Sequence, residues 1–221
     1  MITLRLALVA LVLGASGAMA QPSGIVKAGQ ALERAAGARN AKKISERYDP
    51  TFRKYTKRYF GPAFDWKYFK AQGIAESGLD STAKSWVGAR GVMQLMPSTY
   101  RDIASHRPDF GTIDQPEWNI AAGIMHDRSL WRRWERDSIE TDRREFMFAS
   151  YNAGEGTIMN AQRACVARSL DRRVWTSVET VAPQVPRWRY RETLGYVRKI
   201  RTGIGQLDDK GRLRPPTPAK R

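Results

Sequence analysis

Apolar residues recur at helical spacing along most of this chain, and this periodicity constrains the fold more than any other feature of the sequence. Near the C-terminus, for example, Tyr190, Val197, Ile200 and Ile204 fall on one side of a single helical segment. No stretch shows the sustained alternation of apolar and polar residues that marks a half-buried strand, and no unit of fixed length repeats. We therefore predict an all-α fold.

Residues that commonly cap or stop helices mark the expected boundaries. Asp65 is a candidate N-cap for a helix over residues 65–77, which Gly78 would end. Asn119 is a candidate N-cap for a further helix. The polar loops over residues 79–90 and 107–118 are long enough to build a cleft between helices.

Other helices are expected on the same grounds. Asp142 and Glu145, three residues apart, form a pattern like a capping box at the start of a helix that runs to Gly154. The remaining helices are expected over residues 98–104, 155–168 and 189–206.

Length and composition limit the classes of protein that this chain can be. Its 221 residues fit one domain, and a hydrophobic fraction of 42% excludes wholesale disorder. A single cysteine excludes an internal disulfide framework and a cysteine-rich zinc site. With only two histidines as well, we expect no metal cluster and no cofactor.

The first twenty residues have the pattern of a secretory signal. Arg5 precedes an apolar run over residues 6–13, and the small residues that follow end in Ala18-Met19-Ala20. The alternative is a membrane anchor, but the run is shorter than the roughly 18 to 20 residues that span a bilayer. We predict that residues 1–20 are a cleaved signal peptide, that the mature chain is exported to the periplasm, and that no stable membrane insertion remains.

The chain is strongly basic. It has 38 Lys and Arg against 22 Asp and Glu, a net charge of +16. Loss of residues 1–20 removes Arg5 and leaves 37 basic against 22 acidic residues, a net charge of +15. Nucleic acid is the usual partner of basic proteins, but an exported protein meets anionic envelope polymers instead. A solvated basic face without a dedicated partner is the alternative.

Four short motifs occur in order: AESGL at 75–79, GARGVMQLMP at 88–97, ASYNAG at 149–154 and ETLGYV at 192–197. Together they resemble the catalytic domain of the soluble lytic transglycosylases, which has a goose-type-lysozyme-like fold. The stretch over residues 55–97 is similar to the C-terminal module of membrane-bound lytic transglycosylase F. The resemblance runs from about Tyr48 to Ile200 and implies a catalytic domain over residues 44–207. Composition predicts a linker or loose helix before this domain (21–43) and a basic disordered tail after it (208–221).

The resemblance implies that Glu76 is the catalytic acid. Small neighbours, Ala75, Ser77 and Gly78, leave room for a substrate beside its carboxyl. Ordinary glycosidases use two carboxyl groups, whereas a lytic transglycosylase needs one. Glu76 would protonate the oxygen between N-acetylmuramic acid and N-acetylglucosamine and then accept the proton of the muramyl C6 hydroxyl as that hydroxyl attacks C1. The product is a 1,6-anhydromuramyl end, and the partner is the glycan strand of peptidoglycan.

The resemblance also implies a set of substrate-binding residues around the acid. In this set a tyrosine hydroxyl reaches the acid, a role that falls to Tyr151, while Tyr196 packs beneath the cleft. For Glu192 and Tyr196, structural roles are the alternative to direct contact. Arg90 either contacts a peptide-stem carboxylate or faces water, and Met93 is expected in the core. The candidate substrate-binding residues are Ser85, Gly91, Gln94, Met96, Tyr151, Asn152 and Glu192.

Three other functions remain as alternatives. A hydrolytic muramidase would use the same fold with water in place of the C6 hydroxyl. A catalytically idle peptidoglycan-binding protein would not require the acid, and a nucleic-acid binder does not fit export. An envelope-spanning machine is a candidate partner of a small domain of this kind, by analogy alone.

Overall fold

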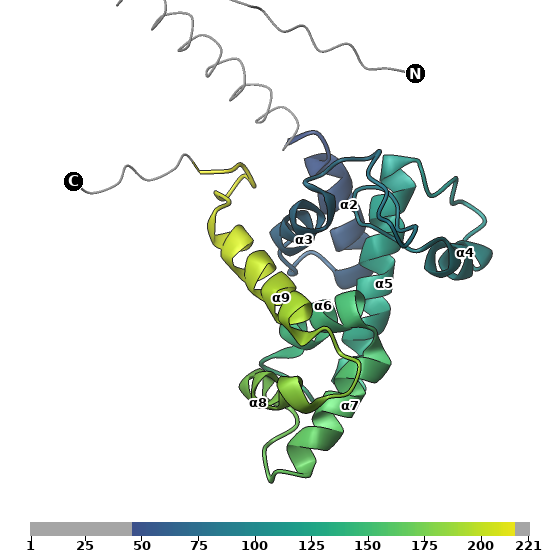
Figure 1. Ribbon diagram of the computed structural model, residues 1–221. Helices are drawn as coiled ribbons and strands as arrows, with labels where there is room; N and C mark the ends of the chain where they lie inside the picture. The colour runs from purple at the N-terminus through teal and green to yellow at the C-terminus, as the bar shows by residue number, and fades with distance from the viewer. Residues whose placement is uncertain (1–45, 215–221) are drawn as a thin grey trace, which may run out of the picture. The chain divides into compact units, whose positions relative to one another are not determined.

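Helix α5 (Pro116–Arg136) is the longest helix in the part of the chain that the computed structural model describes, residues 46–214 (Figure 1). Its 21 residues rise about 31 Å. Helices α2 (Asp49–Phe60), α4 (Pro97–Ser105) and α6 (Arg143–Ala153) pack against it. Small and branched residues on α5 allow this close packing, and Ile120, Ala121, Ala122 and Ile124 are fully buried.

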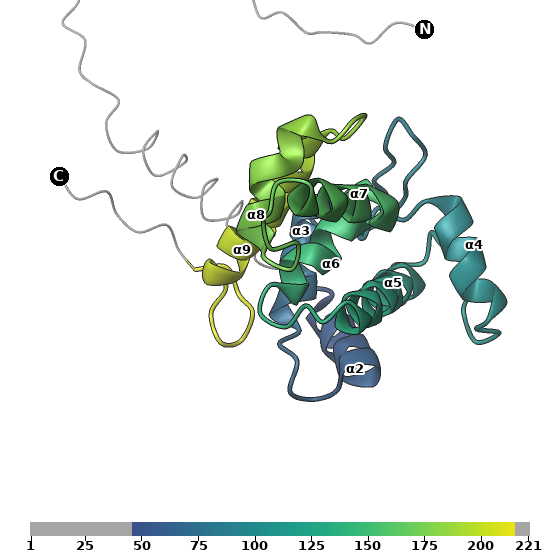
Figure 2. The same ribbon diagram turned by 90° about the horizontal axis from the view of Figure 1, so that it is seen from below.

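A second group of helices joins the two ends of the described chain. Helix α3 (Lys67–Ser77) packs along α9 (Tyr190–Gly205), although more than a hundred residues separate them, and both views show the two helices close together (Figures 1 and 2). Helix α6 contacts both α9 and α7 (Glu155–Val166), and α7 contacts α8 (Trp175–Val181). A short 3-10 helix, Ala182–Gln184, follows α8. The pairing of α3 with α9 is what builds the site described below.

No strand forms within residues 46–214, so the all-α prediction is confirmed. Isolated antiparallel bridges pair Lys84 with Arg90, Arg90 with Leu95, and Leu207 with Leu213. The core is made of large apolar side chains from α2, α3, α5 and α6 and from the loop before α4. Those fully buried include Phe52, Phe69, Met93, Trp134, Phe146 and Met147.

The expected end of α3 at Gly78 is confirmed, but the helix begins at Lys67 and its N-cap position is Trp66, one residue after the expected Asp65. The Asp65 carboxylate accepts a hydrogen bond from the backbone N–H of Lys67 at 3.0 Å, which satisfies a free donor of the first turn. Gly78 ends the helix in the left-handed conformation, with φ of +68°. Its N–H bonds to Ile74 O at 3.0 Å, as in the αL motif that ends many helices, and the N–H of Leu79 bonds to Gly73 O at 3.3 Å.

Two of the expected caps are wrong. Asn119 lies inside α5, which begins at Pro116, and its buried amide bridges loops instead of capping a helix. Asp142 precedes α6 but makes no side-chain cap. Its carboxylate accepts the backbone N–H of Trp175 at 2.7 Å. In both cases the polar side chain forms hydrogen bonds with residues that are distant in the sequence.

The expectation of a disordered tail from residue 208 is also wrong for residues 208–214. Leu207 is buried, and the carbonyl of Gly211 accepts a hydrogen bond at 2.6 Å from the fully buried ammonium of Lys70. The same ammonium pairs with the Asp49 carboxylate at 2.7 Å. A buried charge needs such partners, so this segment is tied to α2 and α3.

Several expectations fall on residues outside 46–214. They are the signal peptide (1–20), the linker or loose helix (21–43) and the end of the basic tail (215–221). Within the described residues, no helix has both the length and the apolar character needed to cross a membrane.

Candidate active site

Glu76 lies in the last turn of α3, where local contacts fix its position. The hydroxyl of Ser77 donates to Val92 O at 2.9 Å, which ties the end of α3 to the loop that carries the second motif. The ammonium of Lys199, on α9, donates to Ala75 O at 3.1 Å. Because the helix stops at Gly78 immediately afterwards, the half-buried carboxyl of Glu76 stands at a helix end held from two sides.

The hydroxyl of Tyr196 on α9 donates to Glu76 Oε1 at 2.5 Å. Burial raises the pKa of Glu76 to about 7, although the Tyr196 hydrogen bond and the Lys199 charge both act to lower it. Burial also raises the pKa of Tyr196 well above its ordinary value, so its hydroxyl stays protonated and acts as a donor. A carboxyl with this pKa is protonated in a large fraction of molecules at neutral pH, which suits a general acid.

Tyr151 does not donate to the acid, contrary to the role implied for it. Its hydroxyl donates to Met93 O at 2.7 Å, and its ring packs against His126 with centroids 5.2 Å apart. Burial raises the pKa of Tyr151 well above its ordinary value, with a further contribution from the nearby Glu76 charge. Tyr151 thus lies near Glu76 and holds the second motif in place, while Tyr196 supplies the hydroxyl to the carboxyl. Met93 is fully buried, as expected.

The loop between α3 and α4 holds four of the predicted site residues. The amide of Gln94 donates to Ala83 O at 3.2 Å and to Gly91 O at 3.0 Å, and thereby closes the loop on itself. The hydroxyl of Ser85 accepts the backbone N–H of Ala89 at 3.0 Å. Met96, next to α4, is 39% exposed. These side chains stiffen and border the loop.

Gly91 has a packing role. Its φ is +74°, and a Cβ added there would lie 2.6 Å from Nδ2 of Asn119. The Asn119 amide accepts the backbone N–H of Met93 at 2.8 Å and donates to Arg90 O at 3.0 Å. The glycine therefore lets Asn119 hold the second motif against α5. The guanidinium of Arg90 pairs with Asp114 at 3.2 Å.

Asn152 and Glu192, predicted from separate motifs, line one pocket of about 190 Å³. The Asn152 carbonyl oxygen accepts the hydroxyl of Thr193 at 2.8 Å, and this hydroxyl accepts the indole N–H of Trp188 at 3.0 Å. Glu192 is exposed and pairs with Arg189 at 2.9 Å. The chain Trp188–Thr193–Asn152 orients the amide of Asn152 at the pocket wall.

The sequence did not predict a second carboxyl near Glu76, that of Asp127. Asp127 on α5 is fully buried, and the Gln72 amide donates to it at 3.4 Å. Burial raises the pKa of Asp127 well above its ordinary value, with a smaller contribution from the charge of Glu76. Oδ2 of Asp127 has no hydrogen-bond partner among residues 46–214. Burial thus favours the neutral form of Asp127, and its side chain is sealed from the surface, where a sugar would bind.

The spacing of residues in the sequence could have placed Tyr196 and Lys199 at the site, but it gives no such indication for Asp127. Glu192, Tyr196 and Lys199 are separated by four and three residues, so they lie along one face of a helix. Asp127 has no such companions. Among residues 46–214, no three His, Cys, Asp or Glu side chains come together as metal ligands would.

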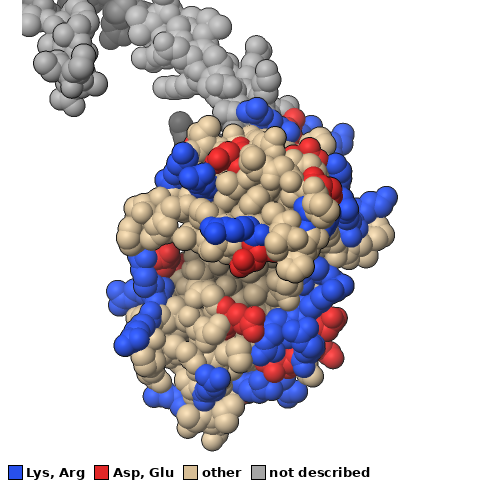
Figure 3. Space-filling view, turned by 90° about the vertical axis from the view of Figure 1, so that its right-hand side faces the viewer, with Lys and Arg blue, Asp and Glu red and all other residues tan. Residues whose placement is uncertain are grey.

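Figure 3 shows a recess across one face of the molecule, at a height between α4 and α7 in Figure 1, with side chains of both charges, Lys and Arg as well as Asp and Glu, along its margins. The net charge of +16 over the whole chain raises the local concentration of anionic polymers.

The fold has a relative among solved structures. The crystal structure of the 70 kDa soluble lytic transglycosylase SLT70 from Escherichia coli matches with a TM-score of 0.52 and 26% sequence identity, covering 71% of this chain and 23% of that chain. The all-α, lysozyme-like fold predicted from the sequence is thus confirmed.

The family follows from the sequence. The family model of the transglycosylase SLT domain matches residues 50–171, more than half of the chain, and the protein belongs to this family. Similar curated proteins are named membrane-bound lytic murein transglycosylase F. The one from Vibrio cholerae is 32% identical over 155 residues, covering 69% of this chain and 27% of that protein. The one from Desulfosudis oleivorans is 33% identical over 157 residues, covering 69% and 32%. The chain thus spans about a third of these relatives or less.

Proposed function

We propose that this protein is a peptidoglycan lytic transglycosylase that cleaves the bond between N-acetylmuramic acid and N-acetylglucosamine without water. The observation that carries the proposal is the state of Glu76, whose buried carboxyl has a pKa of about 7 and accepts the Tyr196 hydroxyl. Membership of the SLT family and the names of the relatives support the same activity.

The chemistry needs one proton donor that becomes an acceptor. Protonated Glu76 gives its proton to the glycosidic oxygen, and the bond from this oxygen to the muramyl C1 breaks. The muramyl acetamido group stabilises the cation at C1. The C6 hydroxyl of the same sugar attacks C1 and returns its proton to the Glu76 carboxylate, which restores the enzyme and leaves a 1,6-anhydromuramyl end. Tyr196 stabilises the carboxylate between these steps, since a hydrogen bond to the charged form favours it.

The environment of Glu76 favours this reaction over hydrolysis with two carboxyl groups. A hydrolase of the ordinary kind needs a second carboxyl about 5 to 9.5 Å from the acid and open to the sugar. Asp127, the carboxyl that the charge of Glu76 influences, is buried completely. An idle binding protein would not need an acid with a raised pKa.

The predicted binding residues would flank the glycan strand on two sides of the acid. Ser85, Gln94 and Met96 lie in the loop before α4 or next to it, and Asn152 and Glu192 line the pocket beside α9. Tyr151 and Gly91 support the cleft from within, through Met93 and Asn119.

Residues 1–20 and the naming of relatives as membrane-bound support export to the periplasm, where peptidoglycan lies.

The test of the proposed activity is digestion of purified cell-wall sacculi followed by mass spectrometry of the released muropeptides. We expect anhydromuramyl ends from the wild type and none from Glu76→Gln. Reducing ends would show a muramidase, and no release by the wild type would show a binding protein.

A further inference from the structure

The end of α5, helix α7 and the loop after α7 enclose two adjoining pockets of about 360 and 240 Å³. Both pockets have Asp137, Val166 and Arg172 in their walls, so they form one hollow. We call it the arginine groove and define it by these three residues together with Arg136 and Arg163. Nothing in the chemistry of Glu76 uses it.

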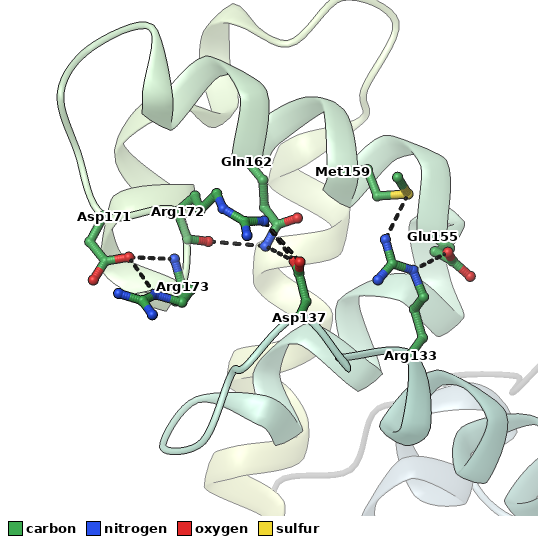
Figure 4. A network of polar contacts seen from close by, with 8 residues as sticks. All are labelled: Arg133, Asp137, Glu155, Met159, Gln162, Asp171, Arg172 and Arg173. Atoms are coloured by element: carbon green, nitrogen blue, oxygen red, sulfur yellow. Dashed lines mark hydrogen bonds and ion pairs between the residues drawn. The ribbon is translucent and has the colours of Figure 1, made fainter. Parts of the chain in front are cut away.

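The floor of the arginine groove is built rigidly (Figure 4). The Asp137 carboxylate accepts two hydrogen bonds from Arg172 Nη1, at 2.9 and 3.0 Å, and one from the Gln162 amide at 2.8 Å. The Gln162 amide also donates to Arg172 O at 3.2 Å. Three segments of the chain therefore meet at one carboxylate, and the groove is formed before any ligand arrives.

The rim of the groove has positive charge that the protein does not neutralise. Arg133 pairs with Glu155 at 2.7 Å and Arg173 with Asp171 at 3.3 Å. In contrast, neither of the exposed guanidiniums of Arg136 and Arg163 forms an ion pair within residues 46–214. A guanidinium presents a fork of donors that matches a carboxylate.

An apolar side chain lies between these charges. Val166 is 61% exposed and belongs to the walls of both pockets. Arg163 Nη1 donates to the neutral Asn160 side chain at 2.6 Å, which leaves the charge of the guanidinium uncompensated. A surface that combines such guanidiniums with an exposed apolar contact fits a peptide that has carboxylates beside an apolar side chain.

The arginine groove faces away from the pocket of Asn152 and Glu192. That pocket is lined on α7 by Thr157, whereas the groove uses Gln162 and Val166. At about 100° per residue, Gln162 and Val166 lie roughly 140° and 180° around the helix from Thr157. A glycan strand bound beside Asn152 therefore passes on the other side of α7.

We propose that the arginine groove binds an acidic segment of a partner protein, with carboxylates on Arg136 and Arg163 and an apolar side chain on Val166. The charge complementarity of the rim and the separation from the cleft favour a separate partner over the strand that is being cut. The proposal does not depend on the activity of Glu76.

The test is fluorescence anisotropy with a labelled synthetic peptide, Glu-Glu-Leu-Glu-Glu, on the full chain. The variant Arg136→Ser/Arg163→Ser removes the two free charges. The matched control, Lys57→Ser/Arg101→Ser, removes two exposed charges from α2 and α4. We expect the groove variant to bind about tenfold more weakly and the control less than twofold, since each exposed charge pair contributes up to about 1 kcal/mol. Thermal unfolding of both variants at the temperature of the wild type shows that they are folded.

Three results would overturn the proposal. Equal losses in both variants would mean attraction to the net charge alone. Failure of the wild type to bind the peptide would mean that the groove does not take this chemistry. Loss of sacculus binding in the groove variant, with peptide binding unchanged, would make the groove a site for peptidoglycan stem peptides.

Discussion

Burial raises the pKa of Glu76 to about 7, against one hydrogen bond and one positive charge that favour its ionised form. Glu76→Gln keeps the shape of the side chain but removes the transferable proton. We expect release of anhydromuropeptides to fall by a factor of at least about 10² to 10⁴. Pelleting with sacculi should stay unchanged, because binding does not need the proton. Activity within tenfold of the wild type would remove Glu76 from its role.

The pH dependence should follow the same carboxyl. Since the acid works in its protonated form and has a pKa of about 7, activity should fall about tenfold for each pH unit above that value. In Tyr196→Phe the hydrogen bond that favours the carboxylate is lost, so the pKa rises further and this alkaline limb should move to higher pH.

The control for this shift is Tyr190→Phe on the same helix, because its hydroxyl accepts a hydrogen bond from Arg191 instead of contacting Glu76. Rates measured from pH 5 to 9 on one sacculus preparation give the comparison. A limb that stays in place in Tyr196→Phe, or moves to lower pH, would contradict the account.

At the scale of elements, the loop between α3 and α4 depends on Gly91. Alanine there would place a Cβ 2.6 Å from the Asn119 amide in a backbone conformation with positive φ. We expect Gly91→Ala to lower the free energy of unfolding by roughly 2 to 3 kcal/mol. The control is Gly156→Ala in α7, where the added Cβ meets open space and should stabilise the protein by about 0.5 to 1 kcal/mol. Urea unfolding measures both, and equal stability of the two variants would refute this role for Gly91.

Elements of this protein could be predicted from local patterns where local contacts decide them. The stop of α3 at Gly78 depends on backbone conformation within a few residues, and the hydrogen bond from the Lys67 N–H to the Asp65 carboxylate spans only two residues. The roles of Asn119 and Asp142 could not be predicted in this way, because their partners lie in other segments of the chain. Asn and Asp side chains that can cap a helix can equally form hydrogen bonds that join two loops.

The same distinction applies to the active site. Glu76 was found from its motif, but its partner Tyr196 lies 120 residues further along the chain and meets it only because α3 packs on α9. Two tyrosines in suitable motifs, Tyr151 and Tyr196, could not be told apart before this packing was known. Asp127 gave no signal, since a buried aspartate in an apolar helix resembles an exposed one in the sequence.

For the whole molecule, the positive charge should govern capture of the insoluble wall. Exposed charges attract over about 8 Å at physiological ionic strength and about 3 Å at 1 M salt. We expect apparent affinity for sacculi to fall steeply with added salt, while turnover of a short uncharged chitooligosaccharide, if it is cut, hardly changes. Pelleting that is equal at low and high salt would mean that the cleft alone holds the substrate.

A truncation tests the contribution of the basic end of the chain. Removal should begin at Pro215 and not at Gly211, because the Gly211 carbonyl is a partner of the buried Lys70 ammonium. Deleting residues 215–221 takes away Lys220 and Arg221. We expect part of the salt-sensitive binding to be lost at low salt, with thermal stability unchanged.

The most direct test of the central claim is digestion of purified sacculi in water enriched in heavy oxygen, with mass spectrometry of the muropeptides. If the C6 hydroxyl attacks C1, the new ends are anhydromuramyl and contain no heavy oxygen, and Glu76→Gln gives no such ends. Muramyl ends that contain heavy oxygen would show that water is the nucleophile and would contradict the account.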